Sequence, residues 1–420
     1  MVKHVLFVTP AYPPMPGGGE RYVRALAHQL VQQGVAVTAV STSAQREPQF
    51  WQGTGSGDNQ IESDEGITVI RCGIRPFPGG RSALLGWRKL MVMLSLLPGS
   101  QTQLLLRMAR YIPPIHQLES TLAQLPQTFD VVHGFNLSWE YSVIAAWQFA
   151  RQRNLPFVVT PFAHFGSGRR DRVALNTMMD HQRHILADAD AVLTLTSVEI
   201  AGMKQWHVTP RHSDVLGGGL DALPLALVAD DIRQKYGLQR PFALFVGRAN
   251  YDKGALHAIE AAIQLNQSGT PLTLAFIGAE TDEFQRVYGR LSAAEREWIR
   301  PLGFLEEAEK HALLAACAML VMPSHSDSFG IVFLEAWAHG KPVIGANAGG
   351  IPGVVDDGQN GLLVPFADVP ALTTAMRTLL TDPARSAAMG QNGRDKVARQ
   401  YTWERVTERL RHNYELVLRG

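Results

Sequence analysis

Short apolar runs recur along the whole chain and alternate with longer amphipathic segments. Most runs are rich in Val and end at Gly, Pro, Ser or Thr, which is typical of strands buried on both faces of a parallel sheet. We therefore predict strands within residues 4–10, 35–42, 67–73, 130–136, 157–163 and 191–197, and again within 242–248, 272–278, 319–324 and 341–346.

The segments between these runs have the spacing of amphipathic helices. The clearest example covers residues 20–34, which end at a glycine that would stop the helix. Its apolar stripe would consist of Val23, Leu26, Ala27, Leu30 and Val31. Strands that alternate with such helices predict parallel βαβ units and an α/β fold.

The order of strand, loop and helix occurs at residues 5–30 and again just past the midpoint, at residues 243–265. Between them, residues 220–240 mix Gly and Pro with a short polar helix, so we place a domain junction there. The prediction is two doubly wound, Rossmann-like domains that face one another across a cleft. Ligands of such sheets bind outside the carboxyl ends of the strands.

Composition narrows the class of protein. The chain has 420 residues, 46% of them hydrophobic and 18% charged, with a formal net charge of +1, which gives no reason to expect a nucleic-acid partner. Cys72 and Cys317 are the two cysteines, so a disulfide framework is not expected and no Cys/His cluster has zinc spacing. No apolar run approaches the roughly 20 residues of a membrane span. We expect a cytoplasmic protein.

Residues 81–114 break the alternating pattern, because they are apolar and basic and contain no acidic residue. A helix of this composition can lie in a membrane interface. The interpretation we favour is that it packs on its own domain with its basic residues solvated, although periodicity alone does not separate the two.

Two loops have residues suited to phosphate. Gly17, Gly18 and Gly19 lie between the first strand and its helix, where backbone N–H groups could approach a phosphate, although a flexible turn explains them equally well. Arg248 follows a strand directly and Lys253 precedes the next helix, so both cations could reach a diphosphate. The alternative is a pair of solvated loop cations.

The stretch SHSDSFGIVFLEAWAHG, beginning at Ser324, places two acids around a helix start. Asp327 precedes the predicted helix and could accept from sugar hydroxyls, while Glu335 lies further along it and could accept from the paired hydroxyls of a ribose. Free N–H groups at the helix start could meet a phosphate. The alternative makes Asp327 a helix N-cap and Glu335 a surface acid.

Taken together, the motifs PGGGERYVRALAHQL, DVVHGFN, GGGLD, FVGRANYDKG, SFGIVFLEAWAHGKPVI, AGGIPGVVDDGQNGLLV and YTWERV resemble those of the family 4 glycosyltransferases, in the same order. The resemblance covers nearly the whole length and implies the two-domain GT-B fold. It implies an acceptor-binding domain at 1–225, a donor-binding domain at 226–399, and a C-terminal helix at 400–420 that crosses back to the first domain.

The resemblance also assigns roles near the reacting sugar. Arg248 and Lys253 match the positions that hold the donor's diphosphate. Asp327 matches the first acid of the E-x7-E motif, near the donor sugar, and His164 resembles a family histidine beside that sugar. Asp327 departs from the usual Glu and is one methylene shorter.

The remaining matched positions would bind other parts of the donor. Glu335 matches the second acid, which holds the ribose, and the backbone amides of Phe329, Gly330 and Ile331 match those that meet sugar and phosphate. Gly353 stands where relatives usually carry Glu, which leaves the donor's identity open.

Two further pairs complete the expected site. Gly303 and Phe304 resemble the stretch that lines the base, and Gly18 and Gly19 match the loop beside the phosphates.

The resemblance thus implies a retaining, metal-independent glycosyltransferase without cofactor, which moves a sugar from a UDP- or GDP-sugar to an acceptor hydroxyl. A lipid-linked acceptor, cell-envelope or exopolysaccharide assembly, and peripheral contact with the inner membrane face through residues 81–114 are hypotheses from the basic apolar segment. Alternatives are a nucleotide-sugar epimerase or sugar phosphorylase on the same fold, or a non-catalytic nucleotide-sugar binding subunit.

Overall fold

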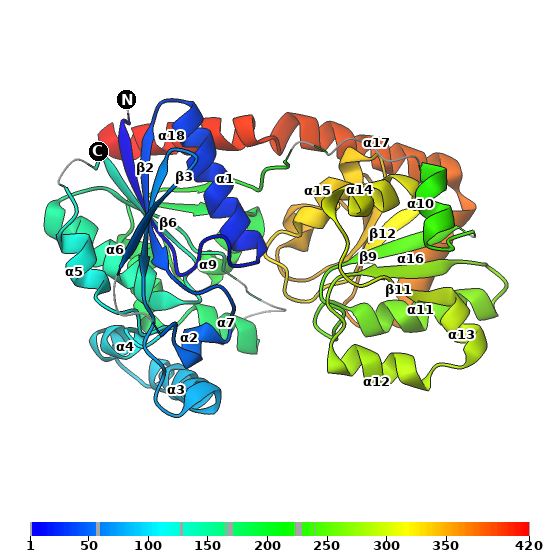
Figure 1. Ribbon diagram of the computed structural model, residues 1–420, viewed down its shortest axis with the longest axis horizontal. Coiled ribbons are helices and arrows are strands. Elements are labelled where there is room, and N and C mark those ends of the chain that lie inside the picture. Colours follow the sequence, from blue (N-terminus) through cyan, green and yellow to red (C-terminus); the bar gives the residue numbers. More distant parts are fainter. Residues whose placement is uncertain are drawn as a thin grey trace. The chain divides into compact units, whose positions relative to one another are not determined.

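The chain forms two compact units in a computed structural model that describes residues 2–55, 59–126, 129–163, 165, 171–221, 223, 229–239 and 241–419. Unit 1 comprises Met1–Gly218 and Trp403–Gly420, and unit 2 comprises Gly219–Thr402. Each unit has its own parallel sheet and its own hydrophobic core, so the protein has two Rossmann-like α/β domains (Figure 1).

Unit 1 is built on an eight-stranded sheet with the order β3-β4-β2-β1-β5-β6-β7-β8. All neighbouring strands are parallel except β3 and β4. The strands are β1 (His4–Val8), β2 (Ala36–Thr42), β3 (Gln60–Asp64), β4 (Ile67–Cys72), β5 (Val131–Phe135), β6 (Phe157–Thr160), β7 (Ala191–Thr194) and β8 (Ser213–Val215).

Helices surround this sheet in the manner of βαβ units. They are α1 (Gly18–Gln32), α2 (Gln49–Gln52), α3 (Gly80–Ser95), α4 (Thr102–Ala109), α5 (Leu118–Ala123), α6 (Glu140–Arg153), α7 (Arg172–Thr177), α8 (Asp180–Asp188), α9 (Ser197–Gln205) and α18 (Trp403–Arg419). The predicted helix at 20–34 is α1, and four of its five stripe residues are buried; Val31 is only half-buried.

The last helix, α18, belongs to unit 1 although it follows unit 2 in the chain. It packs beside α1 (Figure 1). The Tyr414 hydroxyl lies 2.6 Å from His133 Nδ1 in the middle of the sheet, and Arg409 donates to the carbonyl of Leu216. Where the chain enters and leaves unit 2, Leu220 and Thr402 form a parallel bridge.

Unit 2 is a six-stranded parallel sheet with the order β11-β10-β9-β12-β13-β14. Its strands are β9 (Phe242–Val246), β10 (Thr273–Ile277), β11 (Ile299–Pro301), β12 (Met319–Met322), β13 (Val343–Ala346) and β14 (Gly361–Val364). Its helices are α10 (Ala229–Lys235), α11 (Ala255–Gln267), α12 (Asp282–Arg290), α13 (Ala293–Trp298), α14 (Glu307–Ala316), α15 (Ile331–Ala338), the short 3-10 helix η1 (Ile351–Gly353), α16 (Val369–Thr381) and α17 (Pro383–Gln400).

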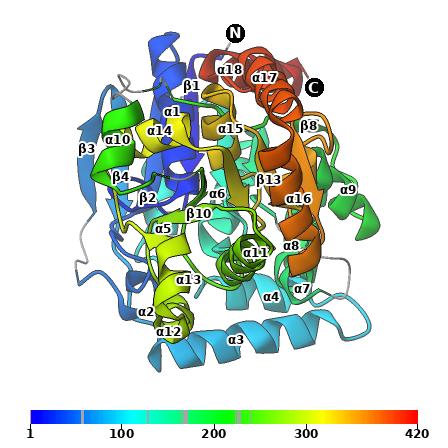
Figure 2. The ribbon, with the colours of Figure 1, turned by 90° about the vertical axis from the view of Figure 1, so that its right-hand side faces the viewer.

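These helices cover both faces of the second sheet. In Figure 1 α14 and α15 lie on one side of the strands and α11 on the other. Figure 2 shows α11 beside α16, and the two helices are in contact. Because both faces are covered, the strands are buried and read as continuous apolar runs in the sequence.

The basic apolar segment 81–114 forms α3 and α4, which lie together at the periphery of unit 1 (Figure 2). Its inner face is in the core, as shown by the buried Leu84 and Met91, whereas Leu85, Met93 and Leu96 are at least half exposed. No helix among the described residues combines the length and apolar character that crossing a membrane requires.

Candidate nucleotide-sugar site

The site lies where the strand order of unit 2 reverses. β9 has β10 on one side and β12 on the other, and open α/β sheets bind ligands beside the loops at such a reversal. Arg248 and Lys253 lie in the loop after β9, and Asp327 lies in the loop after β12. The structure therefore brings Lys253 and Asp327 into contact and places Arg248 in the same loop as Lys253.

Lys253 and Asp327 form an ion pair between the loops after β9 and β12. Lys253 Nζ lies 2.6 Å from Asp327 Oδ1, and the two side chains are 18% and 16% exposed. The second carboxylate oxygen, Oδ2 of Asp327, is buried and has no hydrogen-bond partner among the described residues. A buried carboxylate oxygen without a donor is costly, so it marks a place where a ligand hydroxyl could donate.

The two loops are also joined through their backbones. The amide of His325 donates to the carbonyl of Asp252 over 2.8 Å, and the Ser326 hydroxyl donates to the Asp252 carboxylate. Gly254 allows this approach, because a Cβ at that position would lie 2.2 Å from the carbonyl oxygen of Pro323. The ion pair is thus held by a fixed frame.

A third loop, after β13, supports the Asp327 segment from behind. The amide of Gly350 donates to the Asp327 carbonyl over 2.7 Å, and a Cβ on Gly350 would lie 1.8 Å from the carbonyl oxygen of Ser328. The glycine pair of the AGGIPG motif therefore provides close backbone contact, a role that the sequence analysis did not assign. Gly353, the departure from the family pattern, ends η1.

Helix α15 begins at Ile331, four residues after Asp327, so Asp327 precedes the helix as the sequence predicted. Its N-cap is Gly330, in the left-handed region at φ 77°, and no side chain caps the helix. Asp327 is therefore not the N-cap that the alternative interpretation required. The amides of Ile331 and Val332 have no partner within the helix, because the first turn of any helix leaves its N–H groups unsatisfied. The Phe329 side chain is buried and packs against Tyr401.

Glu335 is 8% exposed and so is not a surface acid. Its carboxylate accepts from Lys310 Nζ over 2.9 Å, and the same ammonium lies 2.6 Å from Glu307. The sequence analysis missed Lys310, because it lies on another helix, α14. Its charge compensates Glu335 and orients the carboxylate.

The side chains around Glu335 include a cluster that could hold a cation. Glu307, His311 and Glu335 offer ligand atoms within 4.8 Å of one another. Burial, with the neighbouring Lys310 charge, lowers the pKa of His311 to about 4, so its imidazole is neutral at pH 7. Lys310 already provides a positive charge between the two carboxylates, which favours the ion-pair interpretation. The spacing Glu307-x3-His311 on one helix was the signal available in the sequence.

The other residues of unit 2 that were predicted to bind the donor follow strands of its sheet. Arg248 is exposed directly after β9, and its guanidinium has no hydrogen-bonding partner among the described residues. Gly303 follows β11 in the left-handed region, and its carbonyl accepts from the Gly278 amide after β10. Phe304 next to it is 82% exposed, which leaves its ring free to stack on a base.

The remaining predicted residues belong to unit 1. Gly18 and Gly19 form the first turn of α1, after β1. The pKa of Glu20 beside them is raised by burial. His164 lies outside the described residues, and its predicted role stays a prediction.

Glu199 was not predicted, although it holds the chain just before that histidine. Its buried carboxylate accepts from the amides of Ala163, Leu195 and Thr196. Burial raises the pKa of Glu199 to about 7 against the opposing effect of these hydrogen bonds. The sequence signal was the spacing Thr196-x2-Glu199, a capping box at the start of α9.

Two family models match the chain. The Glycosyl transferase 4-like domain matches residues 17–219, and Glycosyl transferases group 1 matches residues 228–396. The first covers most of unit 1 and the second covers most of unit 2.

Known proteins and solved structures agree with these matches. The chain is 28% identical to a glycogen synthase of Mycobacterium tuberculosis over 307 residues, which are 69% of this chain and 70% of that protein. Sucrose-phosphate synthase from Thermosynechococcus elongatus has a similar structure, with a TM-score of 0.74, 23% identity and coverage of 99% of both chains. The Anabaena protein HepE, solved in complex with UDP-glucose, has a TM-score of 0.69 and 17% identity, and the match covers 99% of this chain and 100% of HepE.

At these identities the solved structures establish the fold alone, whereas the two family models, which together match most of the chain, establish the family. The chain belongs to the family 4 glycosyltransferases of the GT-B fold and is a nucleotide-sugar glycosyltransferase.

Proposed function

We propose that the protein is a retaining, metal-independent glycosyltransferase that transfers a sugar from a UDP- or GDP-sugar to an acceptor hydroxyl. The observation that carries the proposal is the Lys253–Asp327 pair at the reversal of strand order, with one Asp327 oxygen buried and unpaired. A cation and an acceptor oxygen side by side suit a ligand in which a sugar adjoins a diphosphate.

The proposed donor lies along the carboxyl edge of the second sheet. Phe304 and Gly303 would contact the base, and Glu335, oriented by Lys310, would accept from the ribose hydroxyls. Arg248 and Lys253 would bind the diphosphate. In unit 1, Gly18 and Gly19 are proposed to approach the phosphates, and His164 the reacting sugar.

Asp327 would accept from a hydroxyl of the transferred sugar. The backbone amides of Phe329, Gly330 and Ile331, just before and at the start of α15, would donate to sugar and phosphate oxygens. Asp327 is shorter than the usual Glu of this family, but its unpaired oxygen leaves a donor position for a sugar hydroxyl.

In the proposed reaction, the bond between the sugar C1 and the diphosphate oxygen breaks and positive charge develops on the sugar. The departing diphosphate carries the electron pair, and Arg248, Lys253 and the helix N–H groups stabilise its charge. The acceptor oxygen forms the new bond on the face from which the diphosphate leaves, and its proton passes to the diphosphate. Removing one such preorganised donor typically lowers kcat by a factor of about 10²–10³.

Membrane contact through residues 81–114 is part of the proposal. Leu85, Met93 and Leu96 are exposed next to Arg81 and Lys89, which favours peripheral binding to an anionic inner membrane face. This supports a lipid-linked acceptor and a role in cell-envelope or exopolysaccharide assembly. Sedimentation with vesicles that contain phosphatidylglycerol tests it, and a protein that stays unbound at low salt would contradict it.

The enzymatic test measures nucleoside diphosphate release from UDP- and GDP-sugars, with and without a panel of acceptors. We expect release with one base, faster when an acceptor is present, and unchanged by EDTA. NMR of the product should show the donor's anomeric configuration. A new sugar donor formed without acceptor would instead identify an epimerase, and nucleotide binding without any release would identify a non-catalytic subunit.

A further inference from the structure

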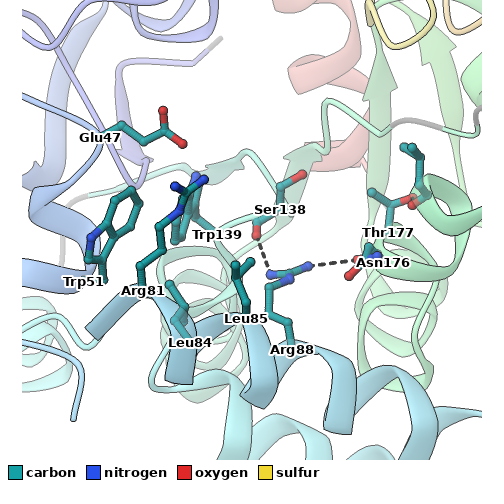
Figure 3. A pocket seen from close by; sticks show the side chains of 11 residues that line it. Glu47, Trp51, Arg81, Leu84, Leu85, Arg88, Ser138, Trp139, Asn176 and Thr177 are labelled. Atoms are coloured by element: carbon teal, nitrogen blue, oxygen red, sulfur yellow. Dashed lines mark hydrogen bonds between the residues drawn. The ribbon is translucent and has the colours of Figure 1, made fainter. Parts of the chain in front are cut away.

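Unit 1 has a pocket of its own, about 440 Å³ in volume, on the carboxyl side of its sheet (Figure 3). Its lining comes from segments that follow four different strands: Glu47 after β2, Arg81 after β4, Ser138 after β5 and Asn176 after β6. A volume of this size is ordinary for a small-molecule site.

The position of this pocket matches the reversal of strand order in unit 1. β1 has β2 and then β4 on one side, and β5 and then β6 on the other. The four segments therefore reach the pocket from both sides of the reversal. Open α/β sheets bind ligands at such a point, so the topology and the cavity indicate the same place independently.

Aromatic and aliphatic side chains form most of the wall. Trp139 is half-buried and packs on the buried ring of Phe50, with ring centroids 4.3 Å apart, so its orientation is fixed. Trp51 lies on the same side of the pocket, next to Arg81, and Leu84 and Leu85 of α3 complete the apolar surface (Figure 3). Fixed indole rings offer a large flat contact and one N–H donor, which suits the partly apolar face of a sugar ring.

The two arginines of the pocket differ in their availability. Arg88 donates to the carbonyls of Ser138 and Asn176 over 2.9 and 3.1 Å and lies 3.4 Å from the buried Glu140, so it ties α3 to the pocket (Figure 3). Arg81 is exposed at the rim and lies over the Trp51 ring, 5.6 Å from its centroid, with no acidic partner among the described residues. Arg81 is therefore free to bind an anion.

The pocket continues into the exposed face of α3. Arg81, Leu85, Lys89 and Met93 follow one another at intervals of four residues and so form one row on the helix, roughly 18 Å long. Leu85 lines the pocket and is also 50% exposed, and Met93 beyond it is 66% exposed. Lys89 lies between the two apolar residues, so an apolar chain that leaves the pocket would contact Leu85, the methylene stem of Lys89 and Met93 in turn.

We propose that this pocket binds the acceptor, and that the acceptor is an anionic amphiphile in which a sugar is joined through phosphate to a hydrocarbon chain. The sugar lies against Trp51 and Trp139, its hydroxyls donate to Glu47, the phosphate binds Arg81, and the chain follows the α3 row. Identifying the ligand as an acceptor rests on the proposed function; the amphiphile site itself does not.

The test is calorimetric titration of the whole protein with dodecyl phosphate below its critical micelle concentration. Dodecyl maltoside and inorganic phosphate are the neutral and chain-free comparisons. We expect dodecyl phosphate to bind more tightly than either. R81Q should weaken its binding tenfold or more, since a charge-assisted contact is lost. The control K204Q removes one positive charge at an exposed residue of α9, outside both the pocket and the α3 row, and should change binding less than twofold.

A second pair of variants tests the apolar wall. L85S should weaken dodecyl phosphate binding at least fivefold, whereas I61S, at a 72% exposed residue of β3, should leave it unchanged. If R81Q and K204Q weaken the binding of dodecyl phosphate equally, and the binding of phosphatidylglycerol vesicles equally, the surface attracts anions without a pocket and the inference is overturned. Binding of dodecyl phosphate no tighter than that of dodecyl maltoside would overturn it as well.

Nucleotide binding to the same variants separates this inference from the proposed function. UDP or GDP should raise the unfolding temperature of R81Q as much as that of the wild type, because Arg81 belongs to the other unit. If no nucleotide binds but dodecyl phosphate does, the proposed function fails and the amphiphile site stands. If nucleotide binds and dodecyl phosphate does not, the inference alone fails.

Discussion

Replacing Lys253 by Met separates the two roles that the structure allows for this residue. Lys253 compensates the Asp327 charge, and in our proposal it also stabilises the departing diphosphate. Breaking a buried ion pair costs about 3–5 kcal/mol and an exposed one costs at most about 1. With side chains 18% and 16% exposed, we expect a loss of about 2 kcal/mol. For a unit of this size that lowers the unfolding temperature by roughly 4–8 °C.

Turnover should fall much further, by about 10²–10³, because the charge on the leaving group is no longer stabilised. The double variant K253M/D327N removes the uncompensated carboxylate, so it should regain most of the stability but turn over no faster than K253M. Nucleoside diphosphate release and thermal unfolding measure both effects. K235M, which breaks the surface pair with Glu309, is the control. Recovery of turnover in the double variant would show that Lys253 serves only to neutralise Asp327.

Three further predictions concern neighbouring groups. G350A should lower the unfolding temperature by several degrees and weaken donor binding, because its Cβ would overlap the Ser328 carbonyl. The control G289A has open space around its Cβ and should change neither. Equal unfolding temperatures for the two variants would refute the close-contact role of Gly350. E335Q should raise the KM for the donor roughly tenfold with little change in kcat, because a contact with the ribose stabilises the bound donor and the transition state equally. A fall in kcat with an unchanged KM would contradict this role. Because burial raises the pKa of Glu199 from 4.5 to about 7, the folded state retains a proton that the unfolded chain loses in this window. Stability should therefore fall as pH rises from 4.5 to 7, by up to about 3 kcal/mol. The free energy of unfolding, measured with urea at several pH values, should show this fall in the wild type and not in E199Q. The same pH dependence in both proteins would contradict the role of Glu199.

The sequence predicted the buried strands well and the edge strands poorly. Each predicted apolar run contains a strand, because burial on both faces produces a continuous apolar signal. β3, β8, β11 and β14 were missed for the opposite reason. β3 is exposed along most of its length, and β8 and β11 each have three residues, too few for a period to appear.

The candidate site, too, could be predicted from the sequence only in part. Arg248, Lys253 and Asp327 could be placed at strand ends from the sequence, since parallel strands put their carboxyl ends at one edge. That Lys253 pairs with Asp327, 74 residues away, depends on the strand order, which the apolar runs do not determine. The compensation of Glu335 by Lys310 and the pocket of unit 1 were missed because they depend on contacts between segments far apart in the chain.

The most direct test of the account is thermal unfolding of the protein and of K253M with UDP, GDP and ADP. A ligand at 100 times its dissociation constant adds about 2.7 kcal/mol of stability, which should raise the wild-type midpoint by roughly 5–10 °C. We predict this rise with UDP or GDP alone, and a much smaller one in K253M at the same concentration. The absence of a rise with any of the three, or an equal rise in K253M, would contradict a nucleotide diphosphate site at Lys253 and Asp327.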